Sequence, residues 1–243
     1  MNRLNVGAMV TALLLLVGLS SCASDTTRSA DHESSQWVGQ AAGSSSHDAY
    51  AGIPNGEIEN AGGDVDFLWD AKDPYYGYKK YPIVARAHID SIDGGRTYSP
   101  ISNQYVFPQT VGRMTIREVY KGSINSGDQL NYSRLGGIVT FDDYWSSLNQ
   151  SQRDKMLNRN GGQKPTAKKY VHEKFIDDID IEVGKEYVVF LIPQSAKDGT
   201  LSEYSISGFQ YGLREAKGTG AVTTVLNNEN KTWESLGSFV KLP

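Results

Sequence analysis

Apolar and polar side chains alternate in two stretches near the middle of the chain, which is the pattern of a half-buried β-strand. Residues 82–90 carry apolar side chains at every second position, namely Ile83, Ala85, Ala87 and Ile89. Residues 111–120 repeat the pattern, with Met114 and Ile116 on one face and Arg113, Thr115 and Arg117 on the other. A period of two predicts strands that bury one face.

Turn sequences connect these stretches to a third one. Residues 93–95, Asp-Gly-Gly, predict a turn after the first strand, and residues 125–128 predict another after the second. Residues 129–134 then fit a third strand. The three predicted strands form a meander.

The next part of the chain changes period. Asn149, followed three residues later by Gln152, has the form of a helix N-cap; helix formers occupy residues 153–158, and Gly161 and Gly162 follow as an exit. We therefore predict one short helix here. Residues 183–192 are apolar on both faces, as expected of a central strand. Further strands are predicted at residues 204–207 and 221–226, with a closing hairpin around residues 227–233.

This order of elements is that of an OB-fold, in which a helix closes the open end of a small barrel between its third and fourth strands. Other small barrels and sandwiches would give much of the same pattern. The predicted fold class is mainly β, an OB-like small barrel. We assign it to a single domain over residues 64–243, which is long enough to bury a core of its own.

The start of the chain has the pattern of a secretory leader. Arg3 precedes an apolar run over residues 6–19, which is too short to span a bilayer comfortably. Residues 19–22, Leu-Ser-Ser-Cys, resemble the lipobox of bacterial lipoproteins, where the cysteine thiol takes a diacylglycerol and the leader is cut just before it. An ordinary signal peptide with a coincidental cysteine is the alternative. We expect a signal peptide over residues 1–21 and acyl chains, such as palmitate, on Cys22.

Residues 22–60 are rich in Ser, Ala, Gly and Asp and contain almost no large apolar side chains. Such a segment buries too little surface to offset its ordering entropy, so we predict a disordered tether after the lipidated cysteine. Cys22 is the only cysteine in the chain, which excludes an internal disulfide. The predicted location is the extracytoplasmic face of the cell membrane.

Charge limits the possible partners. Arg3 is the only charged residue among residues 1–21. Without this segment the chain has 23 Lys and Arg against 28 Asp and Glu, which gives a formal charge of −5. The cations are scattered among acids rather than gathered on a basic face, which argues against nucleic acid. The expected partners are the membrane, through the lipid on Cys22, and an unknown envelope component, glycan or protein.

Three motifs carry a resemblance to known families. They are Ile-Val-Ala-Arg-Ala at residues 83–87, Ile-Arg-Glu-Val-Tyr-Lys-Gly at 116–122 and the stretch from Glu182 to Leu191. Their layout resembles that of exported, lipid-anchored proteins of Gram-positive bacteria without an assigned activity, and the OB barrel of netrin-type and metalloproteinase-inhibitor domains, over residues 82–207. The resemblance implies the barrel. Those inhibitors place a free N-terminal cysteine on the target's zinc and carry disulfides, neither of which a lipidated Cys22 allows.

No enzyme signature is present in the sequence. It lacks His-Glu-x-x-His, Gly-x-Ser-x-Gly and a phosphate-binding loop. Residues 46–48, Ser-His-Asp, contain the letters of a nucleophilic triad, but neighbours in a tether cannot hold the required geometry. We therefore expect no catalytic residue, no cofactor and no enzymatic activity.

Two acidic clusters raise the question of calcium. One comprises Asp64, Asp66, Asp70 and Asp73, and the other covers residues 177–182, with His172 and Glu173 nearby. Neither contains the Asp-x-Asp-x-Asp-Gly loop, and we favour solvated turns with capping aspartates as the explanation of both. We predict no metal site.

Aromatic and cationic residues define a candidate ligand surface. Its members are Tyr75, Tyr76 and Tyr78 before the first strand, His88, Arg113 and Arg117 on polar strand faces, and Tyr211 and Arg214 in a later segment. Exposed tyrosines are frequent where sugars or peptides bind, and the outer face of an OB-like sheet is a common ligand surface. Alternatively, the tyrosines fold back to close the barrel and the polar faces simply meet water.

The leading functional hypothesis is a membrane-anchored lipoprotein of the cell envelope whose OB-like domain is a binding or interaction module. The first alternative is an inhibitor or regulator of a secreted protease that acts through an exposed barrel edge. The second is an enzyme with a site assembled from distant residues such as His88, Glu118 and His172.

Overall fold

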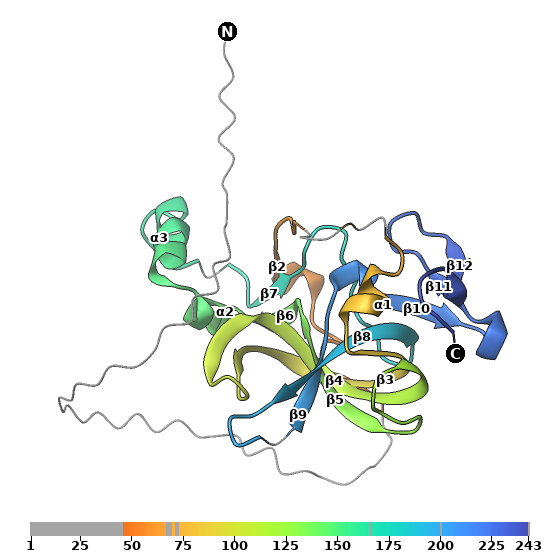
Figure 1. Ribbon diagram of the computed structural model, residues 1–243. Helices are drawn as coiled ribbons and strands as arrows, with labels where there is room; N and C mark the ends of the chain where they lie inside the picture. The colour runs from red at the N-terminus through yellow and green to blue at the C-terminus, as the bar shows by residue number, and fades with distance from the viewer. Residues whose placement is uncertain (1–45, 67–69, 71–72, 166, 200, 243) are drawn as a thin grey trace. The chain divides into compact units, whose positions relative to one another are not determined.

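In the computed structural model, five strands close into a barrel with the strand order of an OB-fold (Figure 1). They are β3 (Ile83–Ser99), β4 (Gln104–Lys121), β5 (Gln129–Leu135), β8 (Glu186–Ser195) and β9 (Leu201–Ile206). Around the ring the order is β3, β4, β5, β9, β8, and β8 pairs again with β3. Only the β5–β9 pair of this ring is parallel. The predicted OB-like barrel is confirmed.

The structure describes residues 46–66, 70, 73–165, 167–199 and 201–242, all of which belong to one unit, Gly43–Pro243. The predicted signal peptide, Cys22 and the tether up to residue 45 lie outside these residues. Within the described ranges, none of the helices has the length and apolar character needed to cross a bilayer.

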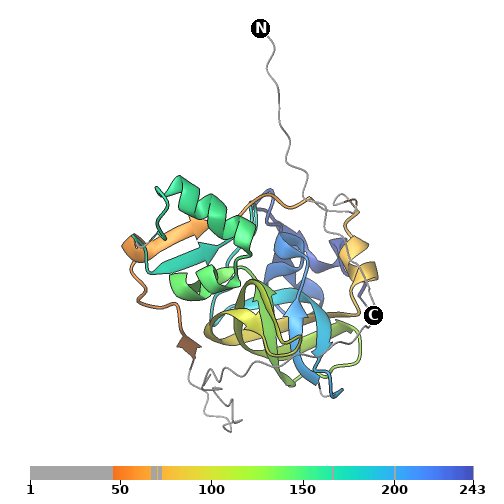
Figure 2. The ribbon, with the colours of Figure 1, turned by 90° about the vertical axis from the view of Figure 1, so that its left-hand side faces the viewer.

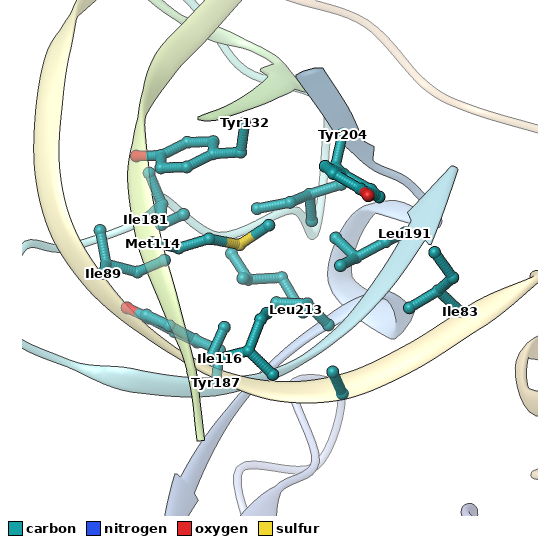
Figure 3. Packing of buried hydrophobic residues seen from close by; sticks show 14 of the residues in the cluster. Ile83, Ile89, Met114, Ile116, Tyr132, Ile181, Tyr187, Leu191, Tyr204 and Leu213 are labelled. Carbon is teal, nitrogen blue, oxygen red and sulfur yellow. The ribbon is translucent and has the colours of Figure 1, made fainter. Parts of the chain in front are cut away.

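The barrel interior is filled by apolar side chains that the period-two pattern places on one face of each strand (Figure 3). Those almost fully removed from solvent include Ile89, Met114, Ile116, Tyr132, Tyr187, Leu191 and Leu213. Met114 and Ile116 are buried while Arg117 is exposed, which confirms the predicted alternation in β4. Burial of these chains is the main stabilising contribution, at about 25 cal/mol per Å² of apolar surface.

A second apolar layer covers the outside of β8. The sheet continues from β8 through β10 (Leu213–Lys217), β11 (Thr224–Leu226) and β12 (Trp233–Ser235). Val188 and Phe190 point into this layer, where they pack with Phe239 and Val240. Because Val189 and Leu191 face the barrel interior, β8 is buried on both sides, as its sequence predicts.

In the described part of the chain, four short 3-10 helices occur in the connections. They are η1 (Asn55–Glu57), η2 (Phe209–Tyr211), η3 (Gly220–Val222) and η4 (Leu236–Ser238). The strand predicted over residues 221–226 is therefore divided between η3 and β11. The predicted closing hairpin forms between β11 and β12, where Leu226 pairs with Trp233.

The two helices after β5 lie beside a separate three-stranded sheet (Figure 2). The sheet consists of β2 (Ile58–Ala61), β7 (Tyr170–Glu173) and β6 (Gly137–Thr140), and the helices are α2 (Phe141–Ser147) and α3 (Gln150–Arg159). The predicted helix is α3, and its Asn149–Gln152 capping box is present. It is α2, which the sequence did not predict, that contacts the barrel strands β3 and β4.

Two predictions about the chain before and within the barrel are wrong. Ordered structure begins well before residue 60, because β1 (His47–Asp48) pairs with β3 and β2 pairs with β7. Strands from distant parts of the chain form backbone hydrogen bonds with these polar segments. The composition of the segments alone does not predict this pairing. The expected turn at residues 93–95 is instead part of β3, with register shifts on either side. Gly95 permits a close approach there, since a Cβ would lie 2.0 Å from the Ile138 carbonyl oxygen.

Candidate ligand-binding site

The structure separates the predicted ligand residues into two groups. Tyr76, Tyr211 and Arg214 come together around one hollow beside α1 (Tyr76–Lys80), although more than 130 residues separate the first from the last. His88, Arg113 and Arg117 lie instead on the polar faces of β3 and β4, as the alternation predicts. The first group forms part of a concave site.

On the polar faces of β3 and β4 each of these three residues has an acidic neighbour. The ion-pair distances are 3.9 Å for His88–Asp90, 3.8 Å for Arg113–Asp93 and 3.7 Å for Arg117–Glu186. Partly exposed pairs at such distances contribute little to stability. This surface is charge-balanced, which agrees with strand faces that meet water.

The hollow beside α1, called the smaller hollow below, has a volume of about 30 Å³. Helix α1 lies directly on the second apolar layer, because a Cβ at Gly77 would be 2.1 Å from the Phe190 ring. The Tyr75 hydroxyl donates to the Gly237 carbonyl at 2.6 Å, which ties the start of the helix to the C-terminal segment. The side chains that form the hollow include Asp73, Tyr76, Phe190, Tyr211, Arg214 and Phe239.

The remaining predicted tyrosine, Tyr78, is half-buried and packs against the second apolar layer. Its hydroxyl donates to the Tyr120 carbonyl at 3.4 Å, and the Lys121 ammonium lies 5.4 Å from its ring centre. Tyr78 therefore fastens α1 to the end of β4, and it is not among the residues that line the smaller hollow.

Two polar groups at the smaller hollow have local partners. Asp73 accepts hydrogen bonds from the Lys79 ammonium and the Tyr75 amide, both at 3.0 Å, and these lower the pKa of its carboxyl group. Burial and a 2.5 Å hydrogen bond to Glu229 raise the pKa of Tyr211 to about 12. Tyr211 is therefore a neutral phenol whose proton is directed at Glu229.

A second hollow, the larger cavity, lies between the end of α1 and the outer face of β9 and has a volume of about 270 Å³. Its polar groups include the Lys80 ammonium and the hydroxyls of Ser205 and Ser207, which lie 3.4 Å apart. Tyr81 and Phe209 supply aromatic surface. The cavity thus offers hydroxyl, cationic and aromatic groups together.

The two hollows share an aromatic wall. Tyr81 lines the larger cavity and Phe190 the smaller hollow, and their rings stack at 5.3 Å between centres. Burial raises the pKa of Tyr81 to about 12, so its hydroxyl stays protonated at neutral pH. The short helix η2 carries Phe209 at the larger cavity and Tyr211 at the smaller hollow.

A buried ion pair lines the larger cavity. Arg134, at the end of β5, donates to the Asp178 carboxylate at 2.5 Å, and Asp178 also accepts from the Ile179 amide at 2.9 Å. Burial raises the pKa of Asp178, and the Arg134 charge opposes that rise. The pair fixes the loop after β7 against the barrel.

Sequence reasoning missed the residues of the larger cavity. Ser205 and Ser207 alternate with the buried Tyr204 and Ile206, which is a readable signal that the serines point outward. Nothing local indicates that Asp178 meets Arg134, because the two residues are 44 positions apart and Asp178 belongs to a run of acids.

The acidic runs and the proposed distant enzyme site form no joint centre in the described part of the chain. No group of three or more His, Cys, Asp or Glu side chains there is placed to hold a metal ion. Asp180 instead contacts His172 and Lys174, at 3.0 and 2.8 Å. Among the same residues, His88, Glu118 and His172 have separate partners, namely Asp90, Tyr120 and Asp180.

Comparison with known proteins returned no relatives. No protein-family model matches the chain. No curated protein and no solved structure matches it either.

Proposed function

We propose that the chain is a membrane-anchored lipoprotein of the cell envelope and that its OB-like barrel binds an envelope glycan or peptide in the larger cavity. The observation that carries the binding proposal is the cavity itself, about 270 Å³ beside the outer face of β9. Ligand sites of this kind combine apolar and aromatic walls with a few directed polar groups.

The chemistry of the cavity favours a polar ligand with flat or apolar faces. The Phe209 ring, held edge-to-face at 5.1 Å by Phe175, supplies rigid surface for stacking. The hydroxyls of Ser205 and Ser207 can donate and accept hydrogen bonds. Sugars and peptides present both features, whereas the acidic chain lacks the basic face that nucleic acid requires.

The anchoring part of the proposal rests on the leader pattern that ends at Cys22. Each buried methylene of an acyl chain contributes about 0.8 kcal/mol, and stable anchoring needs more than one chain. Cys22→Ala should move the protein from the membrane fraction to the soluble fraction, whereas Ser24→Ala should leave it membrane-bound. Retention of Cys22→Ala in the membrane contradicts the lipid anchor.

The binding part is tested by thermal unfolding of the full chain in mild detergent with cell-wall fragments, glycans and peptides, and with calcium and zinc. A ligand that binds only the folded state raises the unfolding midpoint. Ser205→Leu, which narrows the larger cavity and removes one of its hydroxyls, should abolish the shift, and the same change at the exposed Ser123 should not. A shift that survives Ser205→Leu places binding elsewhere and overturns the proposal.

A further inference from the structure

Among the described residues three arginine side chains are buried, and two of them have clear counter-charges. Arg86 contacts the Glu186 carboxylate and donates to the Gly218 carbonyl. Arg134 pairs with Asp178. The fold thus supplies acceptors when it buries a guanidinium for structural reasons.

Arg214 is the exception. Arg214 is 9 % exposed, against 6 % for each of the other two, and its buried Nε, like that of Arg86, has no hydrogen-bond partner. No ion pair and no hydrogen bond joins its guanidinium to another residue of the described ranges. One face of the group lies on the Phe239 ring, 4.7 Å from the ring centre.

The surroundings compensate the charge of Arg214 only in part. Glu234 and Glu229 attract this charge without an ion pair to it, and they accept hydrogen bonds from the Asn227 amide and the Tyr211 hydroxyl, respectively. Burial lowers the pKa of Arg214 despite these acids. A buried charge without a partner is strongly unfavourable, so a guanidinium kept in this position is a ready site for an incoming anion.

We propose that the smaller hollow binds a ligand carboxylate, which pairs with the guanidinium of Arg214. An arginine fork matches the two oxygens of a carboxylate, and charge-assisted hydrogen bonds of this type are about twice as strong as neutral ones. Arg214 lines the hollow together with Tyr76 and Tyr211, so a bound carboxylate would lie beside this residue.

The size and charge of the hollow favour a carboxylate over a phosphate. Its volume of about 30 Å³ accommodates a small planar group more readily than a tetrahedral one. Asp70 and Asp73 also line the hollow and would repel a dianion more than a monoanion, and Lys79 balances the charge of Asp73. The aromatic walls formed by Tyr76, Phe190 and Phe239 suit the apolar atoms that carry the carboxylate, as in a peptide C-terminus or an acidic sugar.

Thermal unfolding of the full chain in mild detergent with acetate as the probe tests the inference. At constant ionic strength, up to about 50 mM acetate should raise the unfolding midpoint, while neutral acetamide should have no effect. Arg214→Met should abolish the acetate shift and also raise the midpoint of the ligand-free protein, because it removes a buried charge that has no ion-pair partner. Arg113→Met, at an exposed arginine, should leave the acetate shift unchanged.

Two results overturn the inference: an acetate shift that persists in Arg214→Met, or no acetate shift in the wild type together with a lower midpoint for Arg214→Met. The second result would make Arg214 purely structural. Ser205→Leu, which tests the proposed function, should retain the acetate response, so failure at the larger cavity is distinguishable from failure at the smaller hollow.

Paired probes then identify which kind of molecule supplies the carboxylate. A peptide with a free C-terminus is compared with its amidated form, and glucuronate is compared with glucose. A shift confined to the charged member of either pair identifies the source. Equal shifts from charged and neutral members contradict recognition of the carboxylate.

Discussion

The guanidinium of Arg134 and the carboxylate of Asp178 form an ion pair whose side chains are only 6 % and 2 % exposed. Arg134 ends the third strand of the barrel, and Asp178 lies in the loop that leads to β8. The pair therefore holds the connection between two barrel strands in place and forms one side of the larger cavity.

Removing one partner of this pair should lower the free energy of unfolding far more than replacing both partners with apolar residues. Asp178→Ala leaves a buried guanidinium without its counter-charge, for which we expect a loss of about 3–5 kcal/mol in the free energy of unfolding. The double variant Arg134→Met with Asp178→Leu should recover much of that loss. Denaturant unfolding measures both, and Glu59→Ala, at an exposed site, should change stability by less than about 0.5 kcal/mol. A double variant as unstable as the single one contradicts a charge-based effect.

Because β8 is buried on both sides, truncating either of two adjacent side chains should destabilise the protein by a similar amount. Val188 is 1 % exposed in the outer layer and Val189 is 0 % exposed in the barrel. Each change to Ala should cost about 1.5–3 kcal/mol in denaturant unfolding. Val222→Ala, at a side chain that is 75 % exposed, should have almost no effect. Tolerance at only one of the two buried positions would mean that β8 has a free face.

Local patterning predicted the strands and the helix that carry their own signal. The alternation in residues 82–90 and 111–120 marks β3 and β4, and the capping box at Asn149 marks the start of α3. In each case the residues concerned are close in sequence, so the period alone specifies the element.

Elements held by distant partners could not be predicted in this way. β1 and β2 are short and polar, and they are strands because β3 and β7 offer them free edges. Residues 93–95 have turn chemistry, yet the neighbouring strands extend β3 through them. Tertiary pairing overrides local preference in such segments.

The candidate site also combines residues that the sequence indicates with contacts that only the fold determines. Tyr76, Tyr211 and Arg214 stand out in the sequence as aromatic and cationic residues, and the fold brings them together. That Arg214 is buried without a partner, while Arg134 finds Asp178, depends on contacts between distant segments. No periodicity in the sequence contains that information.

The contacts of Asp180 predict a defined pH dependence. Burial would raise the pKa of Asp180, but hydrogen bonds with His172 and Lys174 outweigh it and lower the pKa from 3.8 to about 2. Because the folded-state pKa lies below the unfolded value, the ionised group stabilises the fold above about pH 4, and this contribution is lost as the pH falls toward 2. The side chain is 51 % exposed, so the contribution is at most about 1 kcal/mol.

Urea unfolding of the wild type and Asp180→Asn at several pH values measures this contribution. The stability difference between the two proteins should be present near neutral pH and shrink as the pH falls through the range from about 4 to 2. Lys174→Met should remove part of the same contribution. Parallel curves for the wild type and Asp180→Asn would contradict the lowered pKa.

The capping box of α3 should control local rather than global stability. Asn149 accepts from the Gln152 amide at 3.0 Å, and Gln152 accepts from the Asn149 amide at 2.9 Å. Asn149→Ala should cost the helix about 1 kcal/mol. Because α3 buries no side chain completely, the loss should appear as faster amide hydrogen exchange within α3, with little change in the global unfolding midpoint. Asn158→Ala, inside the same helix, should not accelerate exchange.

The close contact between Gly77 and Phe190 makes α1, one wall of the smaller hollow, sensitive to substitution at Gly77. A Cβ at Gly77 would meet the Phe190 ring at 2.1 Å, and the ring is 3 % exposed and stacked on Tyr81, so it has little room to retreat. Gly77→Ala should therefore push α1 outward and cost about 1–3 kcal/mol. Gly56→Ala is the matched control, since no atom lies within 4 Å of a Cβ placed there. If Gly77→Ala is as well tolerated as Gly56→Ala in denaturant unfolding, α1 does not pack on Phe190, and the aromatic wall between the two hollows is not rigid.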